Sequence, residues 1–160
     1  PGPMGSRHPS IAPFEAFKTK DSYIIIAAGN DKLFAKLCDV LKIPEASNDE
    51  RFNSNSLRCE NMDQLKEIFE KQLNSKTTNE WVKEMEALKI PCGPIFNIKQ
   101  AVENPQVQER NMIVKSYHKI IGEFKSAGNP IKMSTYKDEN TRGDIPDLDE
   151  HREKIIKEFN

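Results

Sequence analysis

The sequence predicts an α+β fold in which a small antiparallel sheet is combined with several helices. Short apolar or extended stretches, notably residues 13–19 and 23–28, are separated by turn-forming residues, as expected for paired strands. Longer stretches carry apolar residues at helical spacing and begin at Asn, Ser or Thr residues that suit the start of a helix. These two patterns together define the α+β class, and no internal repeat or low-complexity tract is present.

A hairpin and a helix are predicted at the beginning of the chain. Residues 13–19 and 23–28 are expected to form its two arms, with residues 20–22 as the turn. Asn30 is suited to cap the following helix, and Pro44 is expected to end it. The apolar residues of that helix share one face: Leu33, Phe34, Leu37, Val40 and Leu41.

Two amphipathic helices are predicted in the middle of the chain. The expected boundaries are Ser54 or Ser56 to about Asn74 for the first, and Thr77 or Thr78 to about Lys89 for the second. Pro91 requires the second helix to end, because it disfavours helical backbone at the residue before it. The buried stripes are predicted to be Leu65, Ile68, Phe69 and Leu73, followed by Trp81, Val82, Met85 and Leu88.

The remaining elements are predicted to be short. Residues 92–96 are expected to be extended, Asn97 to cap a helix over residues 98–103, and Pro105 to begin another that ends near Asn111. Strands are predicted at residues 112–118, 123–127 and 131–134, irregular chain at 137–149, and a last helix at 150–159.

Composition excludes several classes of function. With 24 basic and 25 acidic residues the chain has no excess charge to attract a nucleic acid. No apolar run approaches the roughly 18 residues that cross a bilayer, so no membrane partner is expected. The three cysteines match neither a disulfide framework nor a zinc pattern, which predicts an intracellular protein, cytoplasmic or mitochondrial. Residues 1–4, Pro-Gly-Pro-Met, are interpreted as a cloning remnant.

The stretch Ile-Pro-Cys-Gly-Pro at residues 90–94 raises the question whether Cys92 is a nucleophile, a metal ligand or part of a corner. A reactive cysteine needs a base, a cation or a helix N-terminus to lower its pKa. Cys92 instead follows the predicted C-terminus of a helix, where the dipole has the opposite sign. Pro91 and Pro94 each fix one φ angle, so we interpret Cys92 as a small apolar side chain in a rigid corner.

The histidines present no recognisable catalytic or metal motif. His8 lies near the N-terminus, while His118 and His151 have no carboxylate or histidine partner at helical spacing. A phosphate-binding glycine loop and a Gly-x-Ser-x-Gly elbow are both absent from the sequence. No catalytic residue and no metal ligand is therefore predicted from the residues alone.

Five segments, taken in order, carry a resemblance to a known family. The first and second are HPSIAPFEAFKTKDSYIIIAAGNDKLFAKLC and NDERFNSNSLRCENMDQLKEIFEKQL. The third and most similar is TTNEWVKEMEALKIPCGPIFNIKQAVENPQVQERNMIV, with its tryptophan helix, PCGP corner and NPQVQERNM step, and GNPIKMS and DLDEHREKIIKEF complete the series. Together these segments, which cover residues 5–160, resemble the small domain of class III CoA-transferases. That family includes formyl-CoA transferase, the carnitine- and bile-acid-inducible enzymes and α-methylacyl-CoA racemase.

The resemblance implies a division of labour in the intact enzyme. In the family, a large domain holds CoA and supplies an aspartate that forms acyl-anhydride and CoA-thioester intermediates. Residues 5–135 would be the small α+β domain, and residues 136–160 a polar linker and C-terminal helix that return to the missing large domain. A homodimer acting on an acyl-CoA and a carboxylic acid is expected, with the CoA thioester as substrate and no tightly bound cofactor.

The resemblance also gives a candidate site. In the family, the stretch before the first small-domain strand lies near the active site, and it is rich in glycine in the oxalate enzyme. Here that stretch contains Arg7, His8, Pro9 and Ser10, which would line the acyl-acceptor pocket. The planar guanidinium of Arg7 suits a substrate carboxylate. No catalytic residue is assigned within this chain.

Two departures from the family pattern bear on this prediction. Ser22 replaces a glycine in the hairpin turn, which favours a different type of turn. The final helix opens with Leu148-Asp149-Glu150-His151-Arg152 where the family has Leu-Gly-Glu-His-Thr, which affects the docking of the tail. Two alternatives to a CoA-transferase fragment remain open: a fragment of an α-methylacyl-CoA racemase, and a stand-alone binding module without enzymatic activity.

Overall fold

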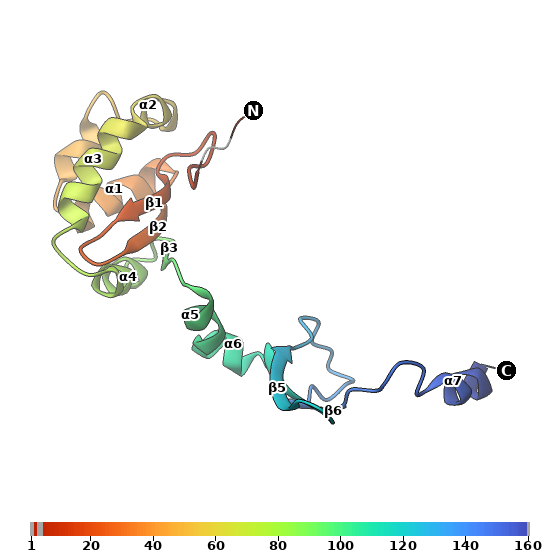
Figure 1. Cartoon of the computed structure of the whole chain (residues 1–160). Coiled ribbons are helices and arrows are strands. Elements are labelled where there is room, and N and C mark those ends of the chain that lie inside the picture. The colour runs from red at the N-terminus through yellow and green to blue at the C-terminus, as the bar shows by residue number, and fades with distance from the viewer. Residues whose placement is uncertain (1, 3–4, 160) are drawn as a thin grey trace. The chain divides into compact units, whose positions relative to one another are not determined.

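The computed structural model describes Gly2 and residues 5–159, which contain seven α-helices, one 3-10 helix and two three-stranded sheets (Figure 1). The predicted α+β class is therefore confirmed, with two small sheets in place of one. The chain divides into two compact units, which we call the N-terminal unit (Pro1–Ile95) and the C-terminal unit (Phe96–Asn160). That residues 5–135 form one domain and residues 136–160 return to a larger one stays a prediction.

The sheet of the N-terminal unit is antiparallel throughout. β1 (Phe14–Lys18) pairs with β2 (Tyr23–Ala27), and β2 pairs with the short strand β3 (Cys92–Pro94), so that Ile26 lies opposite Cys92. Alternate side chains of this sheet, including Phe17 and Ile24, are fully buried. The turn accommodates Ser22 without left-handed backbone, because a hydrogen bond from the Thr19 N–H to the Ser22 carbonyl closes it (3.0 Å).

Helix α1 (Asp31–Val40) begins as predicted. Asn30 caps it by accepting a hydrogen bond from the Leu33 N–H at 2.9 Å. It is followed by a 3-10 helix, η1 (Pro44–Asn48), in which Pro44 occupies the first turn. Leu37 and Cys38 of α1 face the core.

The single helix predicted between Ser54 or Ser56 and Asn74 is wrong in one respect: it is two helices, α2 (Asn55–Glu60) and α3 (Met62–Leu73). Asn61 separates them, with φ −106° and ψ 23°. Its side-chain amide donates to the Leu57 carbonyl (2.9 Å), a local bond that competes with the regular helical pattern. The apolar stripe of α3 is nevertheless the predicted one, with Leu65, Phe69 and Leu73 fully buried.

Helix α4 (Thr78–Ala87) completes the N-terminal unit. It begins after Thr77, one of the two predicted starts, and Thr77 and Glu80 form a capping box there. The indole N–H of Trp81 donates to the Leu73 carbonyl (2.8 Å) and links α4 to α3. The ring of Phe69 lies 5.7 Å from that of Phe17 and 6.2 Å from that of Phe34, so the core joins sheet and helices in one apolar cluster.

The C-terminal unit consists of two short helices, a second sheet and a final helix. α5 (Ile98–Glu103) begins at Asn97, α6 (Pro105–Glu109) has Pro105 in its first turn, and α7 (Arg152–Phe159) ends the described chain. In the sheet, β4 (Ile113–His118) lies between β5 (Gly122–Ala127), which is antiparallel to it, and β6 (Thr141–Asp144), which is parallel to it.

Two predictions about this second sheet are wrong. Residues 131–134 form no strand, because the Asn129 side chain accepts the Ile131 N–H (3.0 Å) and Pro130 has no N–H to offer. The third strand is instead β6, within residues 137–149, which were predicted to be irregular. Backbone bonds from Lys115 to Asn140 and from Ile145 to Tyr117 tie this segment to β4 (3.0 and 3.1 Å).

Candidate functional site

The segment that precedes β1 is folded against the N-terminal unit. The His8 N–H donates to the Phe14 carbonyl at 2.9 Å, and the two rings stack with centroids 5.3 Å apart and an interplanar angle of 9°. The His8 Nδ1 accepts the Ser10 N–H at 3.2 Å. These contacts fix the imidazole beside β1, with its Nδ1 already used as an acceptor.

Three of the four predicted site residues line one pocket of about 200 Å³. They are Arg7, His8 and Pro9, joined by Ile11, Ala12, Phe14, Glu15, Cys59 and Met62. Ser10 does not line this pocket: it is exposed, and its carbonyl accepts a hydrogen bond from the Asn55 side chain at 2.9 Å. The pocket therefore combines an arginine, a histidine and a carboxylate with apolar walls.

Arg7 is held by two carboxylates. Its Nε donates to Glu15 Oε1 (2.9 Å) and its Nη2 donates to Asp63 Oδ1 (2.7 Å). The bond to Asp63, together with the bond to Glu15, raises the pKa of Arg7 against the lowering effect of burial. The guanidinium is thus a permanent cation at the edge of the pocket.

Glu15 is the buried partner in this cluster and was missed by the sequence reasoning. Only 3% of the residue is exposed, and its second oxygen, Oε2, accepts a hydrogen bond from Lys66 Nζ (2.5 Å). The available signal was the strand period, since Glu15 and the core residue Phe17 are two positions apart and therefore lie on one face. A carboxylate at a core-facing position predicts a buried cation beside it.

Arg58 is a second residue that the sequence reasoning missed. Its side chain is fully buried, and it donates to the carbonyls of Ala12 (2.8 Å), Phe52 (2.9 Å) and Gly29 (3.1 Å). It also pairs with Asp31 (2.8 Å) and lies 4.4 Å above the Phe34 ring. Arg58 therefore ties Ala12, which lines the candidate pocket, to the chain at Phe52 and Gly29, although nothing in its neighbouring sequence marks it as buried.

A larger and more apolar pocket of about 490 Å³ adjoins Ile11 and Phe14. Its other lining residues are Ala27, Gly29, Asn30, Leu33 and Asn55. Gly29 suits this arrangement, because a Cβ there would lie 2.1 Å from the Ile11 Cγ2 and the Ile11 side chain would have to move. The turn after β2 thus allows the segment before β1 to approach closely.

Cys92 is an edge-strand residue and not an activated thiol. It pairs with Ile26 and is half-buried, and this burial, followed by the charge of Glu86, raises the pKa of Cys92. Burial likewise raises the pKa of Cys38 to about 12. The interpretation of the Pro-Cys-Gly-Pro stretch as a structural corner agrees with this geometry.

Two further features of the part of the chain that the structure describes concern metal binding and membrane crossing. Among residues 5–159, no three His, Cys, Asp or Glu side chains are grouped so that they could hold a metal ion. None of the described helices has the length and apolar character that crossing a bilayer requires. His118 ends β4 and accepts the Ile120 N–H at 3.2 Å, and His151 lies in the exposed approach to α7.

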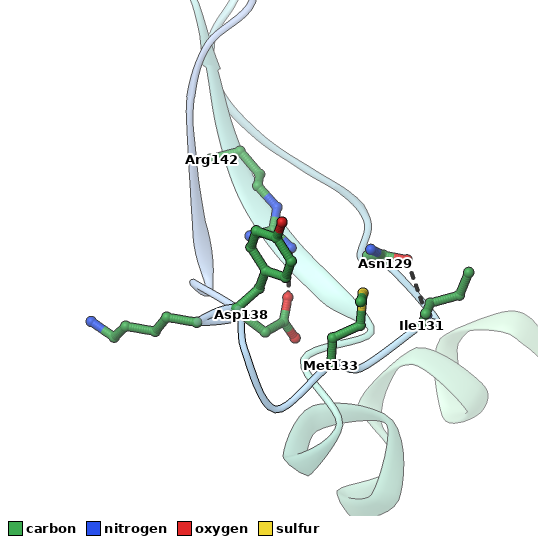
Figure 2. Close-up of a pocket in the computed structure, with 7 residues that line it drawn as sticks. Asn129, Ile131, Met133, Asp138 and Arg142 are labelled. Atoms are coloured by element: carbon green, nitrogen blue, oxygen red, sulfur yellow. Dashed lines mark hydrogen bonds and ion pairs between the residues drawn. The ribbon is translucent and has the colours of Figure 1, made fainter.

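A separate pocket of about 360 Å³ lies in the C-terminal unit (Figure 2). All of its lining residues come from the segment 129–142. The side chains of Asp138 and Arg142 point toward each other there, with 2.9 Å between Arg142 Nη2 and Asp138 Oδ1. The hydrogen bond from Lys132, followed by that from Arg142, lowers the pKa of Asp138. This carboxylate is satisfied by two cations, so the pocket contains no evident general base.

The sequence model of CoA-transferase family III matches residues 1–152. The chain belongs to this family. It is 39% identical over 159 residues to the acetyl-CoA:oxalate CoA-transferase of Acetobacter aceti, and 34% identical over 154 residues to the succinyl-CoA:glutarate CoA-transferase of Homo sapiens. A crystal structure of a CAIB/BAIF family protein from Brucella suis matches all of the chain with a TM-score of 0.76 and 32% identity.

The chain corresponds to only part of these family III proteins. The match to the Acetobacter protein includes 99% of this chain but only 40% of that protein's length. The match to the human protein includes 96% of this chain and 35% of that protein's length. The Brucella suis structure is covered to 41%. The chain therefore matches a minor part of each relative almost from end to end.

Proposed function

We propose that this chain is the small-domain part of a family III acyl-CoA:carboxylate CoA-transferase whose acceptor is a dicarboxylic acid. The observation that carries the proposal is the match of 99% of the chain, at 39% identity, to an acetyl-CoA:oxalate CoA-transferase. Two further relatives are named for glutarate and mesaconate. Oxalate, glutarate and mesaconate all carry two carboxylates, which supports a diacid as the acceptor here.

In this proposal Arg7, His8 and Pro9 contribute a wall of the acyl-acceptor pocket, and Ser10, which does not line it, ties the same segment to Asn55. The catalytic aspartate and most of the CoA site belong to the large domain, which would contribute to the same site in a homodimer. The CoA thioester is a substrate, and no tightly bound cofactor takes part. We place the enzyme inside the cell, in the cytoplasm or mitochondrion.

The choice between transfer and racemisation rests on the relatives and not on this pocket. A racemase has to move a proton at carbon, which needs a positioned general base. Glu15, the carboxylate of the pocket, already accepts hydrogen bonds from Arg7 and Lys66, and the Nδ1 of His8 accepts from Ser10. In this proposal the reacting groups belong to the large domain, so the support for transfer is that the relatives are named as CoA-transferases.

The direct test uses the natural polypeptide that contains this sequence. We expect its mass to be more than twice that of the 18.3 kDa chain. When the purified protein is incubated with acetyl-CoA or succinyl-CoA and isotopically labelled oxalate or glutarate, it should form the labelled CoA thioester of the diacid. Mass spectrometry detects this product. The 160-residue chain alone should form none.

Other outcomes would replace the proposal. Exchange of the α-proton of a 2-methylacyl-CoA in heavy water, without CoA transfer, would identify a racemase. If the natural polypeptide has about the same mass as this chain and turns over no acyl-CoA, a binding module would remain as the function. Turnover by the chain alone would contradict the assignment of catalysis to a separate large domain.

A further inference from the structure

We propose that Arg7 binds the distal carboxylate of the dicarboxylic acid, that Glu15 and Lys66 position it, and that Asp63 occupies this place when no acid is bound. This inference deepens the proposed function and depends on it. It assigns the selectivity for a second carboxylate to four side chains of the N-terminal unit.

Arg7 lies at the junction of two pockets. It lines the pocket of about 200 Å³ described above and a more open one of about 430 Å³, formed by Gly5, Ser6, Arg7, Glu15 and Lys66. Side chains of the segment before β1, of β1 and of α3 therefore converge on one guanidinium. An acid that enters from either side meets the same cation.

Glu15 fixes the inner part of the Arg7 fork. Both of its oxygens are used, Oε1 by Arg7 Nε (2.9 Å) and Oε2 by Lys66 Nζ (2.5 Å). Lys66 is fixed in turn by the Ala16 carbonyl at 2.9 Å. This arrangement holds the arginine side chain at its Nε through the buried Glu15 and leaves Nη2 paired with the exposed Asp63.

Asp63 is the replaceable partner. Its side chain is 87% exposed, and it meets Arg7 only through Nη2, at 2.7 Å. Exposed ion pairs of this kind contribute little to stability, so an incoming carboxylate exchanges with Asp63 at small cost. Among the described residues, the Arg7 side chain donates hydrogen bonds only to Glu15 and Asp63.

The charge of the cluster suits one carboxylate. With Asp63 displaced, Arg7 and Lys66 face Glu15 alone, and a single positive charge remains to be balanced. A carboxylate balances it and matches the planar fork of arginine with two parallel hydrogen bonds. A phosphate of the CoA diphosphate also carries a single charge, so we assign the acid to Arg7 on the diacid substrates of the relatives, and the kinetics below distinguish it from the acyl-CoA.

The test is steady-state kinetics of the natural full-length protein and its variants with a diacid and with the monoacid of the same length. Arg7→Gln should raise KM for the diacid by about 10- to 100-fold, the loss of a charged hydrogen bond. KM for the acyl-CoA should stay within about twofold, and the preference for diacid over monoacid should disappear. Arg7→Lys should recover part of that preference, because it restores the charge without the fork.

Two further variants separate positioning from folding. Glu15→Gln should raise KM for the diacid without changing kcat at saturating acid, because Arg7 loses its anchor. Asp63→Asn should lower KM for the diacid, because it removes the anion that competes for Arg7, and it should not affect folding, because Asp63 is exposed. Arg51→Gln is the matched control, since Arg51 is an exposed arginine in the same unit, paired with Asp49 (2.7 Å).

The outcomes are distinguishable from failure of the proposed function. If the unmodified protein transfers no CoA, the proposed function itself fails. If it does, and Arg7→Gln raises KM for the acyl-CoA instead of the diacid, Arg7 binds a phosphate and the inference is overturned. A rise in KM for the diacid with Asp63→Asn, or equal loss with Arg51→Gln, would overturn it as well.

Discussion

The two units of this chain differ sharply in how much they bury. The N-terminal unit has a continuous core of sheet and helix residues, with Phe17, Phe34 and Phe69 at its centre. Of the described residues in the C-terminal unit, only Val114, Ser116 and Gly128 are buried. Its exposed apolar residues are Phe96, Ile98, Val102, Tyr117, Ile120, Ile121, Ile131, Met133, Tyr136, Ile145, Leu148, Ile155, Ile156 and Phe159.

This difference suggests different sources of stability. Burial of apolar surface is the dominant favourable term in folding, and the N-terminal unit obtains it from its own residues. The C-terminal unit has a paired sheet that buries Val114, but Tyr117 of the sheet and most apolar side chains of the unit's loops and final helix are exposed. We expect those side chains to be covered in the natural protein by the large domain or by a second subunit.

Limited proteolysis of the 160-residue chain is the strongest way to break this comparison. The C-terminal unit should be cleaved first, by about 100-fold or more in rate, because its backbone opens at low cost in free energy. The N-terminal unit, residues 5–95, should remain as the resistant product. Mass spectrometry of the digest follows both units over time. If both units disappear at the same rate, they unfold together, and the difference in burial does not produce a difference in stability.

A pair of phenylalanines compares the units by substitution. Phe69 is fully buried and Phe159 is 81% exposed. Phe69→Ala should lower the free energy of unfolding by about 3–5 kcal/mol, and Phe159→Ala by less than about 0.5 kcal/mol in this chain. Urea unfolding followed by Trp81 fluorescence measures the first change, and urea unfolding followed by far-ultraviolet circular dichroism, which reports on both units, measures the second. In the natural protein the cost of Phe159→Ala should rise if a partner covers α7.

Two arginines sharpen the account of the N-terminal unit. Arg58→Met leaves the carbonyls of Ala12, Phe52 and Gly29 without a partner. At about 1–3 kcal/mol for each unsatisfied group, the loss of stability should be at least about 3 kcal/mol. Arg51→Met, at an exposed ion pair, should cost less than about 1 kcal/mol. Equal and small losses in thermal unfolding would mean that Arg58 is not a structural anchor.

The smallest expected effect concerns acid. Asp21 Oδ1 accepts hydrogen bonds from the Thr78 N–H (2.8 Å) and hydroxyl (3.0 Å), and the first of these is the main cause that lowers the pKa of Asp21 below its ordinary value of 3.8. A carboxyl whose pKa is lower in the folded state stabilises the fold above its unfolded pKa. That stabilisation is lost as the pH falls through the folded pKa.

Asp21→Asn should therefore destabilise the chain at neutral pH and converge with the unmodified chain in strong acid. Urea titrations at about pH 7 and about pH 3 check this difference. A constant difference between the two proteins at both pH values would show that the Asp21 charge makes no contribution to the start of α4.

Local chemistry made much of the fold predictable. The hairpin, the Asn30, Thr77 and Asn97 caps and the end of α4 before Pro91 follow from side-chain and backbone preferences that act over a few residues. The interruption at Asn61 depends on a competition between two acceptable local bonds. Strand β6 depends on pairing with a distant edge, which no local pattern of residues 137–149 reveals.

The candidate site divides in the same way. Arg7, His8 and Pro9 were found because the resemblance to class III CoA-transferases placed them before the first strand. The partners of Arg7 come from β1 and α3, and their meeting depends on how these elements pack. Arg58 bonds to three carbonyls in three separate loops, so only the folded chain shows why it is buried.

The central claim is that the segment around Arg7 and His8 forms a wall of a family III transferase site, and that the nucleophile of the reaction lies outside this chain. The most direct measurement is to incubate the natural full-length protein with its acyl-CoA, quench the reaction in acid, and locate covalently attached CoA by peptide mass spectrometry. We predict the adduct on an aspartate outside residues 5–159. An adduct on Cys92, or on any carboxylate within residues 5–159, would contradict the claim.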